Sequence, residues 1–345
     1  ALGFHQSAER EPHEAVWLAW PSHSELWGEG LKRTQREFKA LCQAIADLDP
    51  QTGIAHGEDL WVLVGNENSA QEARVALEGL PVRFFQIPFG DIWLRDTAPI
   101  FMRHREKGRA AVCFDFNGWG KKYVLPHDAD VAQNIADTMG SGVEQFKIPW
   151  ILEGGSVEVD GEGTCLTTRQ CLLHPLRNEG WSQEQLEVGL KAALGVKKVL
   201  WLNKGLKNDH TDGHIDTLVR FSRPGVVLCM QASSDKDPNT KVFSEIKMDL
   251  EKMKDAKERP LRVIEIPSPG PIYNEEGDIM PASYLNFYIA NTQVVVPTYG
   301  SEYDEEAVHL IGKCFPGHRT VGLSAKAILE GGGAFHCITQ QVPIE

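Results

Sequence analysis

The stretch ILEGG occupies residues 151–155 and occurs again at 328–332, and both copies are followed by a β-like run. Five short stretches rich in polar residues accompany this repeat. Each is identified here by one member: Asp96, Glu153, His214, Ser283 and Cys337. These members are 57, 61, 69 and 54 residues apart in a chain of 345 residues. Such even spacing predicts five related units, each of which brings one strand end to a common centre.

Helical and strand-like patterns alternate along the chain, which predicts an α/β fold. Residues 31–48 carry an apolar stripe at helical spacing on a charged segment. We expect strands at 60–64 and 82–86, with a helix near 68–79 between them. Three pairs follow, each a helix and then a strand: 183–194 with 197–202, 241–255 with 261–266, and 304–315 with 319–323. No linker rich in Ser, Gly or Pro separates these elements, so we expect one compact body.

The composition is that of a globular protein with an acidic balance: 42% of the residues are hydrophobic, 24% are charged, and the formal net charge is -13. An acidic chain lacks the basic footprint that neutralises phosphates, so we expect no nucleic acid partner and favour a small cationic ligand. Neither a run of 18 apolar residues nor a signal-peptide pattern occurs, and we therefore expect no membrane span and no export. Seven scattered cysteines are typical of reduced thiols in a cytoplasmic protein. A homo-oligomer is compatible with all of these features.

The segment GGGAFHCITQQ, residues 331–341, places the thiol of Cys337 after three glycines. Glycine lets the backbone turn tightly or a ligand approach closely, so this position suits a nucleophile. His336 precedes Cys337, and neighbours in an extended segment point to opposite faces, so we expect the base for this thiol to come from elsewhere. The alternative is that Cys337 is a small buried hydrophobic side chain like the other cysteines.

The segment NDHTDGHIDTLVRF, residues 208–221, has a polar first half and a strand-like second half. If it is extended, one face carries every second residue, namely His210, Asp212, His214 and Asp216. A histidine beside a carboxylate suits a general acid/base and an anion that holds a substrate. The same four residues could instead form a metal site or an ordinary surface turn. The segment lacks the uninterrupted helix and the intervening Glu of a zinc protease, so we favour the acid/base.

Residues 90–101, GDIWLRDTAPIF, have the alternating pattern of a strand, with Asp91 and Trp93 on one face and Asp96 on the other. A charge among apolar residues needs a partner. Asp96 is therefore either a member of an internal ion pair or an anion that awaits a cationic ligand.

Two more segments contain candidate binding residues. Residues 151–168 include Glu153 immediately before two glycines, whereas Glu158 and Asp160 look like exposed strand and turn charges. The stretch FNGWG places Trp119 in a flexible loop, where it either packs against neighbours or forms a wall for a cationic ligand.

These carboxylates, the histidine, the cysteine and the tryptophans would together form a distinctive pocket. A guanidinium is a planar cation with five N–H donors, so paired carboxylates can hold it and turn its central carbon toward a sulfur atom. A free thiol is mostly protonated at neutral pH, and nearby carboxylates raise its pKa further. Activation of Cys337 therefore needs a positive charge, either from His214 as an imidazolium or from the substrate itself. His214 could then protonate departing ammonia and later deprotonate the water that cleaves the S-alkyl-thiouronium intermediate.

Eight segments of the chain, taken together, resemble the agmatine deiminase family and occur in that family's order. They are EPHEAVWLAWP (11–21), DIWLRDTAP (91–99), FNGWG (116–120), ILEGGSVEVDGEGTCLTT (151–168), NDHTDGHIDT (208–217), ASYLNFYIAN (282–291), VVVPTYG (294–300) and GGGAFHCITQQ (331–341). The resemblance implies the pentein fold, a five-bladed pseudo-symmetric α/β propeller of guanidine-modifying enzymes. Residues 1–345 would then form a single catalytic domain of five ββαβ-like repeats.

By matching motifs, the resemblance implies roles for five residues that carry the chemistry. Cys337 would be the nucleophile and His214 the acid/base. Asp96 and Asp216 would bind the guanidinium. Glu153 resembles the carboxylate that supports the histidine and the guanidinium.

The resemblance also implies a substrate and a pocket wall. Trp93 and Trp119 stand where the family lines its substrate pocket. The implied reaction is the hydrolysis of agmatine to N-carbamoylputrescine and ammonia, a step of putrescine synthesis, without a metal or an organic cofactor.

The chain departs from the family's usual motifs at a few positions. Many agmatine deiminases have an acidic residue where His210 stands and Asn where Asp212 stands, which concerns the substrate tail rather than the reaction. The same broad family includes peptidylarginine deiminases, so deimination of peptidyl-arginine or free arginine to citrulline is the alternative. A guanidine-binding module without turnover and a metal hydrolase built on residues 210–216 are further alternatives.

Overall fold

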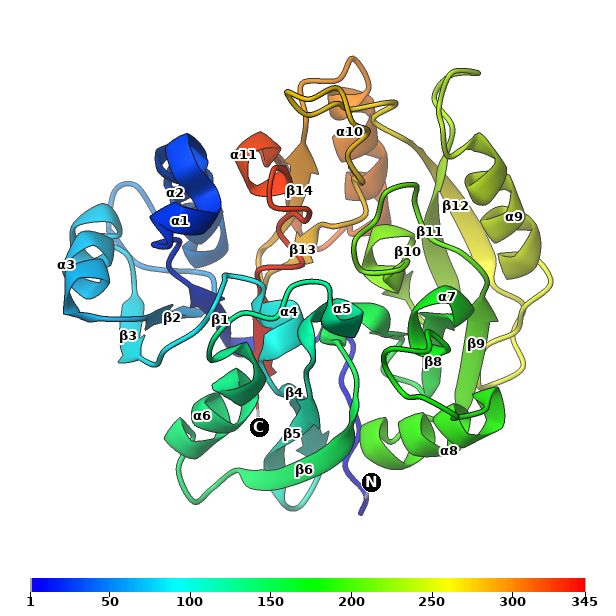
Figure 1. Cartoon of the computed structure of the whole chain (residues 1–345), viewed down its shortest axis with the longest axis horizontal. Coiled ribbons are helices and arrows are strands. Elements are labelled where there is room, and N and C mark those ends of the chain that lie inside the picture. Colours follow the sequence, from blue (N-terminus) through cyan, green and yellow to red (C-terminus); the bar gives the residue numbers. More distant parts are fainter. Residues whose placement is uncertain (1, 345) are drawn as a thin grey trace.

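The computed structural model describes residues 2–344, whose sixteen strands form five small sheets around a common centre (Figure 1). The first sheet comprises β1 (His13–Ala19), β2 (Asp59–Val64), β3 (Val82–Gln86) and β16 (Gln340–Pro343). The other sheets, in chain order, comprise β4 (Ile100–His104), β5 (Gly108–Asp115) and β6 (Glu144–Ile151); β7 (Glu158–Val159), β8 (Thr164–Thr168) and β9 (Lys198–Leu202); β10 (Val219–Arg223), β11 (Val226–Gln231) and β12 (Arg262–Pro267); and β13 (Tyr288–Ile289), β14 (Gln293–Thr298) and β15 (Arg319–Ser324).

The five sheets share one plan of pairing. The first strand pairs antiparallel with the second, and a helical connection leads from the second strand to a parallel third strand. The long helices of these connections are α6 (Val131–Thr138), α8 (Gln183–Leu194), α9 (Thr240–Leu250) and α10 (Asp304–Cys314). In the first sheet, β16 is the antiparallel partner of β1, α2 (Leu31–Ala46) connects β1 to β2, and α3 (Glu67–Ala76) leads to the additional strand β3. The C-terminal strand thereby closes the ring, and the predicted pentein fold, an α/β propeller of five related units, is confirmed.

The predicted helices and strands agree with the observed elements to within a few residues, and local signals explain their ends. Helix α8 begins at a capping box in which Ser182 accepts the backbone N–H of Gln185 and the Gln185 side chain accepts that of Ser182. It ends at Gly195, whose φ of 70° lies in the left-handed region that glycine adopts without strain. Helix α9 departs most from its prediction, since it ends at Leu250 rather than near residue 255.

The even spacing of the five polar stretches follows from the pairing plan. Each stretch lies in the connection between the last strand of one sheet and the first strand of the next. Short helical turns occupy most of these connections: α4 (Leu94–Thr97), η3 (Gly154–Ser156), η4 (Ile215–Thr217) and α11 (Lys326–Leu329). Figure 1 shows α4 and the red C-terminal connection near the middle of the ring, with α6, α8 and α9 at its outer rim.

The middle strands of the sheets are almost completely buried. The apolar runs of β2, β11 and β14 have few exposed positions because these strands lie inside their sheets, with helices packed against them. Buried hydrophobic residues form one large cluster and a smaller one around the second and third sheets. None of the helices within residues 2–344 is long and apolar enough to cross a membrane.

Two predicted strands are wrong. The segment around Asp96 is not extended, because residues 94–97 form α4, and Trp93 and Asp96 therefore reach the same cavity. The segment before β10 is also not extended: Asp212 has a φ of 65°, and η4 follows His214. Both segments are connections with tight turns, and alternating side chains alone do not distinguish such turns from strands.

The expectation that Glu158 and Asp160 are exposed is also wrong. Their exposed fractions are 7% and 0%. Glu158 accepts hydrogen bonds from Arg220 Nε at 3.1 Å and from the backbone N–H of Phe221 at 2.7 Å. This residue of β7 is therefore one member of a buried ion pair.

Candidate active site

One cavity of about 260 Å³ receives residues from most of the polar stretches. Its lining comprises Leu26, Asp91, Trp93, Asp96, Trp119, Tyr123, Leu125, His210, Thr211, Glu330, Gly331, Gly332, Gly333 and Cys337. His214, Glu153 and Asp216 are buried next to these residues, with exposed fractions of 1% or less. The structure therefore brings together all seven residues that the sequence singled out.

Cys337 lies in a tight turn, not in the extended segment that we predicted. The backbone N–H of Arg95 donates to the carbonyl of Cys337 at 3.1 Å, and the Arg95 guanidinium donates to the carbonyl of His336 and to the side chain of Gln340. Arg95 thus holds the turn that contains Cys337 with both its backbone and its side chain. A Cβ at Gly333 would lie 3.1 Å from the sulfur, which explains the need for glycine there.

The thiol of Cys337 is buried beside two carboxylates that favour its protonated form, and the Asn286 amide opposes them only in part. Asn286 Nδ2 lies 3.2 Å from the sulfur, and the thiol lies 3.7 Å from Oδ2 of Asp216. Burial raises the pKa of this thiol well above its ordinary value, and the charges of Asp216 and Asp96 raise it further. An additional positive charge is therefore needed to form the thiolate at neutral pH.

Asp96 is held in place by two donors. Its Oδ1 accepts the backbone N–H of Gly155 at 2.9 Å, and its Oδ2 accepts the indole N–H of Trp119 at 2.8 Å. Burial raises the pKa of Asp96, although the nearby His214 opposes this increase. Trp119 adopts a left-handed backbone with φ 53°, which is unusual for a side chain of this size, so its indole is placed over the carboxylate by a strained turn.

Gly155 marks the point where three of the polar stretches meet. A Cβ at this glycine would lie 2.6 Å from Nδ1 of His214, 2.9 Å from Oδ1 of Asp96 and 3.1 Å from Oδ2 of Asp216. Only a residue without a side chain fits among these groups. The second glycine of the first ILEGG copy is therefore required by the packing of the site.

Asp216 is a buried carboxylate with one oxygen engaged and one unengaged. Its Oδ2 lies 2.8 Å from Nδ1 of His336 and 3.1 Å from Nδ2 of Asn286, whereas its Oδ1 has no hydrogen-bond partner within residues 2–344. Burial works against its charge, but the contact with His336 prevails and lowers the pKa of Asp216. The unengaged oxygen can accept an N–H from a cationic ligand.

The imidazole of His214 lies between two carboxylates. Its Nδ1 is 3.7 Å from Asp96 and its Nε2 is 3.9 Å from Glu153. Burial alone would lower the pKa of His214, but Asp96 foremost, together with Glu153, raises it well above its ordinary value. The raised pKa favours the imidazolium form of His214, which can serve as a proton donor.

Glu153 is supported from behind by Arg177, whose Nε lies 2.9 and 3.0 Å from the two carboxylate oxygens. Burial would raise the pKa of Glu153, but Arg177 and His214 overcome this effect and lower it. Arg177 also donates to Asp212 at 2.7 Å. The carboxylate is thus kept ionised and fixed next to the imidazole.

The structure does not support a metal site built from residues 210–216. Asp212 is paired with Lys122 and Arg177. Within residues 2–344, ligand atoms within 4.8 Å of one another occur instead in Glu153, Cys171 and His214. Both oxygens of Glu153 already accept hydrogen bonds from a guanidinium, which would repel a metal cation.

The mouth of the cavity is aromatic. The indole N–H groups of Trp93 and Trp27 donate to the two oxygens of Asp91 at 2.8 and 3.0 Å. On another side, the Tyr123 hydroxyl lies 3.4 Å from Nδ1 of His210. Trp93 and Trp119 are both 7% exposed and form walls of the cavity.

Sequence reasoning missed two residues of the site and misjudged one stretch. Asn286, within the motif ASYLNFYIAN, contacts the thiol, whereas the hydroxyl of Ser283 in the same stretch donates to the carbonyl of Thr217 and accepts the backbone N–H of Leu285. The unusual motif pointed to this stretch but did not say which side chain reaches the sulfur. Arg177 belongs to no motif that we identified, and only the tertiary structure reveals it.

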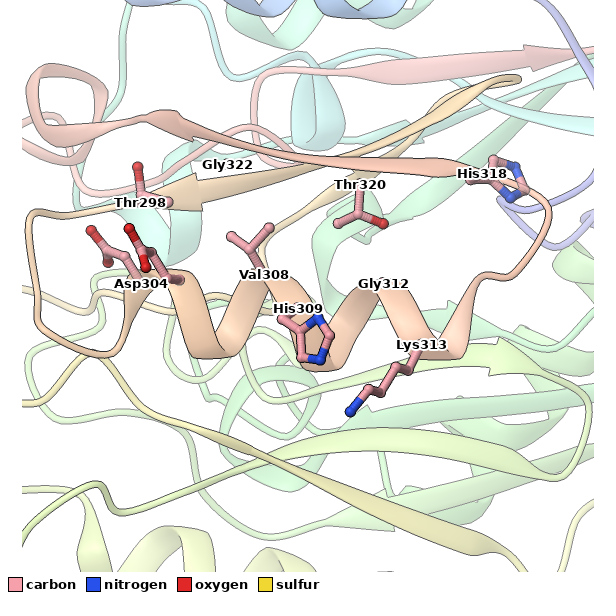
Figure 2. A pocket seen from close by; sticks show the side chains of 10 residues that line it. Thr298, Asp304, Val308, His309, Gly312, Lys313, His318, Thr320 and Gly322 are labelled. Carbon is pink, nitrogen blue, oxygen red and sulfur yellow. The ribbon is translucent and has the colours of Figure 1, made fainter.

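A larger hollow of about 730 Å³ lies between α10 and β15 on the fifth sheet (Figure 2). Figure 2 shows Val308, His309 and Lys313 along α10, with Thr320 on the facing strand. None of the seven predicted site residues lines it. Asp304, at one end, is engaged by the Tyr284 hydroxyl at 2.7 Å and caps a backbone turn. We therefore place the chemistry in the smaller, enclosed cavity.

Comparisons with known proteins identify the family of the chain. A family model described as Porphyromonas-type peptidyl-arginine deiminase matches residues 5–343. The agmatine deiminase of Ectopseudomonas mendocina is 36% identical over 366 aligned residues, which cover 99% of this chain and 96% of the relative.

Solved structures extend the likeness to three dimensions. The agmatine deiminase of Enterococcus faecalis superimposes with a TM-score of 0.91 and is 33% identical, over 99% of this chain and 96% of the other. An agmatine deiminase of C. jejuni with substrate bound gives a TM-score of 0.87 at 27% identity, over 98% and 96% of the two chains.

Proposed function

Since the chain belongs to the Porphyromonas-type peptidyl-arginine deiminase family, we propose that it hydrolyses agmatine to N-carbamoylputrescine and ammonia through a covalent intermediate on Cys337. One observation carries the proposal: a buried thiol, an imidazole and three carboxylates from separate segments meet around one cavity. The names of the relatives support agmatine as the substrate.

Asp96 and Asp216 are the proposed ligands of the guanidinium. Both are buried, and the unengaged Oδ1 of Asp216 offers an acceptor for a substrate N–H. Two carboxylates around a planar cation would turn its central carbon toward the sulfur of Cys337. The bound cation supplies the positive charge that the thiol otherwise lacks, because it offsets the two carboxylates that raise the pKa of Cys337.

The proposed reaction then proceeds in two halves. When the cation binds, Cys337 loses its proton to solvent. The thiolate attacks the guanidinium carbon and forms a carbon–sulfur bond, and the carbon–nitrogen bond breaks as His214 donates a proton to the departing ammonia. This leaves an S-alkyl-thiouronium on Cys337. His214, now neutral, takes a proton from a water molecule that attacks the same carbon. The carbon–sulfur bond breaks, and the ureido product and the thiol are released.

The lining of the cavity favours agmatine over arginine. Arginine would need a cationic side chain for its carboxylate, and the cavity lining includes no Lys or Arg within the described part of the chain. Arg95 and Arg177 are committed to Gln340 and Glu153, and Arg169 donates to Gln183 and to the backbone of Trp201. Free arginine is therefore a poorer substrate in this proposal.

The remaining expectations are part of the same proposal. We infer that residues 1–345 act as one catalytic domain, without metal or organic cofactor, on a small soluble substrate and not on nucleic acid. The seven cysteines are all free and buried, which is compatible with the expected cytoplasmic location.

A direct test compares the formation of ureido product from agmatine, free arginine and a short arginine peptide. We expect turnover of agmatine that withstands EDTA, is abolished by prior treatment with iodoacetamide at alkaline pH, and is protected from that treatment by agmatine. Cys337→Ala should abolish turnover, while Cys314→Ala, a change of the same size in the buried end of α10, should retain it. Full turnover by Cys337→Ala would refute the mechanism, and preference for an arginine compound would refute the substrate.

A further inference from the structure

We propose that Glu330, at the mouth of the cavity, binds the distal ammonium of the substrate and so determines selectivity for guanidines with a second positive charge. This inference rests on the proposed function, because it concerns the tail of a substrate whose guanidinium lies at Asp96 and Asp216. Agmatine carries its second charge at the opposite end of a four-carbon chain. A charge at the far end of an apolar slot needs an anion there.

Three carboxylates line the cavity: Asp91, Asp96 and Glu330. Asp96 serves the guanidinium. Asp91 is 8% exposed, and its oxygens accept N–H groups from Trp27, Trp93 and the backbone of Ile92. Its hydrogen-bonding capacity is thus used inside the protein. Glu330 is the remaining lining carboxylate within residues 2–344, and its side chain is 45% exposed.

The position of Glu330 along the wall supports this assignment. The three glycines 331–333 connect Glu330 to the turn that carries Cys337 and line the cavity together with both residues. A Cβ at Gly333 would touch the sulfur at 3.1 Å, whereas one at Gly331 would lie 2.6 and 2.7 Å from Trp27 and Trp93. This wall therefore begins at the thiol, passes the indole rings without side chains of its own, and ends at a carboxylate. This order of thiol, apolar rings and carboxylate matches the order of guanidinium, methylene chain and ammonium in agmatine.

Glu330 already has a weak cationic partner that a ligand can displace. Arg33 Nη2 lies 3.2 Å from both carboxylate oxygens, and the Arg33 side chain is 49% exposed. Exposed ion pairs of this kind contribute little to stability, so an ammonium held by its own guanidinium anchor can replace Arg33. Arg33 thus acts as a competitor of the substrate tail.

The test compares agmatine with butylguanidine, which has the same chain but no ammonium. We expect Glu330→Gln to raise the KM for agmatine about fivefold and to leave the KM for butylguanidine within twofold of wild type. Arg33→Gln should lower the KM for agmatine, because the competitor is gone. Glu29→Gln is the matched control, since it removes a nearby exposed charge outside the cavity lining.

Equal effects of Glu330→Gln on both substrates, or no effect on either, would overturn the role of Glu330. An equal rise in KM for agmatine with Glu29→Gln would also overturn it, because the effect would then be one of general charge. These outcomes differ from failure of the proposed function, in which the wild-type protein forms no ureido product from agmatine. Thermal unfolding of each variant shows whether the fold is retained.

Discussion

Asp216→Asn should make the thiol of Cys337 more acidic while it abolishes deimination. The sulfur lies 3.7 Å from Oδ2 of Asp216, and Coulomb's law with an effective dielectric of about 20 gives about 4 kcal/mol for two charges at this distance. At 1.36 kcal/mol per unit this corresponds to about 3 pKa units. His336, 2.8 Å from the same oxygen, offsets part of this charge, so we expect the pKa of Cys337 to decrease by about 2 units.

The assay is the rate of alkylation of Cys337 by iodoacetamide as a function of pH, read by mass spectrometry of the peptide that contains residue 337. Alkylation needs the thiolate but no substrate, so it separates thiol acidity from catalysis. In the wild type the rate should rise only in strongly alkaline solution, since burial and two carboxylates raise the pKa of Cys337 well above its ordinary value. In Asp216→Asn the midpoint should move about 2 pH units lower.

The matched control is Glu330→Gln, which removes a carboxylate from the mouth of the same cavity. It should leave the alkylation midpoint nearly unchanged, because the half-exposed charge of Glu330 is screened by solvent, whereas Asp216 and Asp96 are buried beside the thiol. A midpoint that stays constant or rises in Asp216→Asn would refute the electrostatic argument for activation by the substrate.

Two further predictions concern pH. Glu153→Gln should lower the pKa of His214, because Glu153 and Asp96 raise it in the wild type. The alkaline limb of the pH profile of kcat, where His214 loses the proton it donates, should then move about 1 pH unit lower. An unchanged limb would contradict the role of His214. Asp128 is buried with one oxygen unpartnered, and burial foremost raises its pKa to about 7. The folded state therefore binds this proton more tightly than the unfolded chain, so its stabilising contribution is complete below about pH 4 and is lost as the pH rises through 7. Asp128→Asn should increase the free energy of unfolding in urea by up to about 4 kcal/mol at pH 8 and much less at pH 4.5, and an equal change at both pH values would contradict this linkage.

Much of the site could be predicted because its residues occur in strings with unusual composition. Cys337 follows three glycines, and His214 precedes Asp216 within a polar segment, so their chemistry was visible in the chain. The wrong prediction of a strand around Asp96 did not prevent the choice of Asp96 as a site residue, because that choice rested on a charge among apolar residues. It did affect the geometry, since only the turn α4 brings Trp93 and Asp96 to one cavity.

Other features depend on contacts between segments that carry no common pattern. Arg177 supports Glu153 from 24 residues away, and Arg95 holds the turn of Cys337 across 241 residues or more. Asn286 reaches the sulfur from a different connection. Glu158 looked like an ordinary strand charge but forms a buried pair with Arg220, because a sequence does not show which charges lose their contact with water.

The sequence by itself determined the repeated units, the alternation of helices and strands, and the residue types able to hold a guanidinium before a thiol. These properties are local: hydrophobic periodicity, glycine before a nucleophile, and the spacing of polar connections. Only the tertiary structure decided which oxygen of Asp216 is unengaged, what raises the pKa values of Cys337 and His214, and that Glu330 stands at the mouth of the cavity. Protonation and access depend on distances between segments that meet when the ring closes, and these distances are set by the packing of all five sheets together.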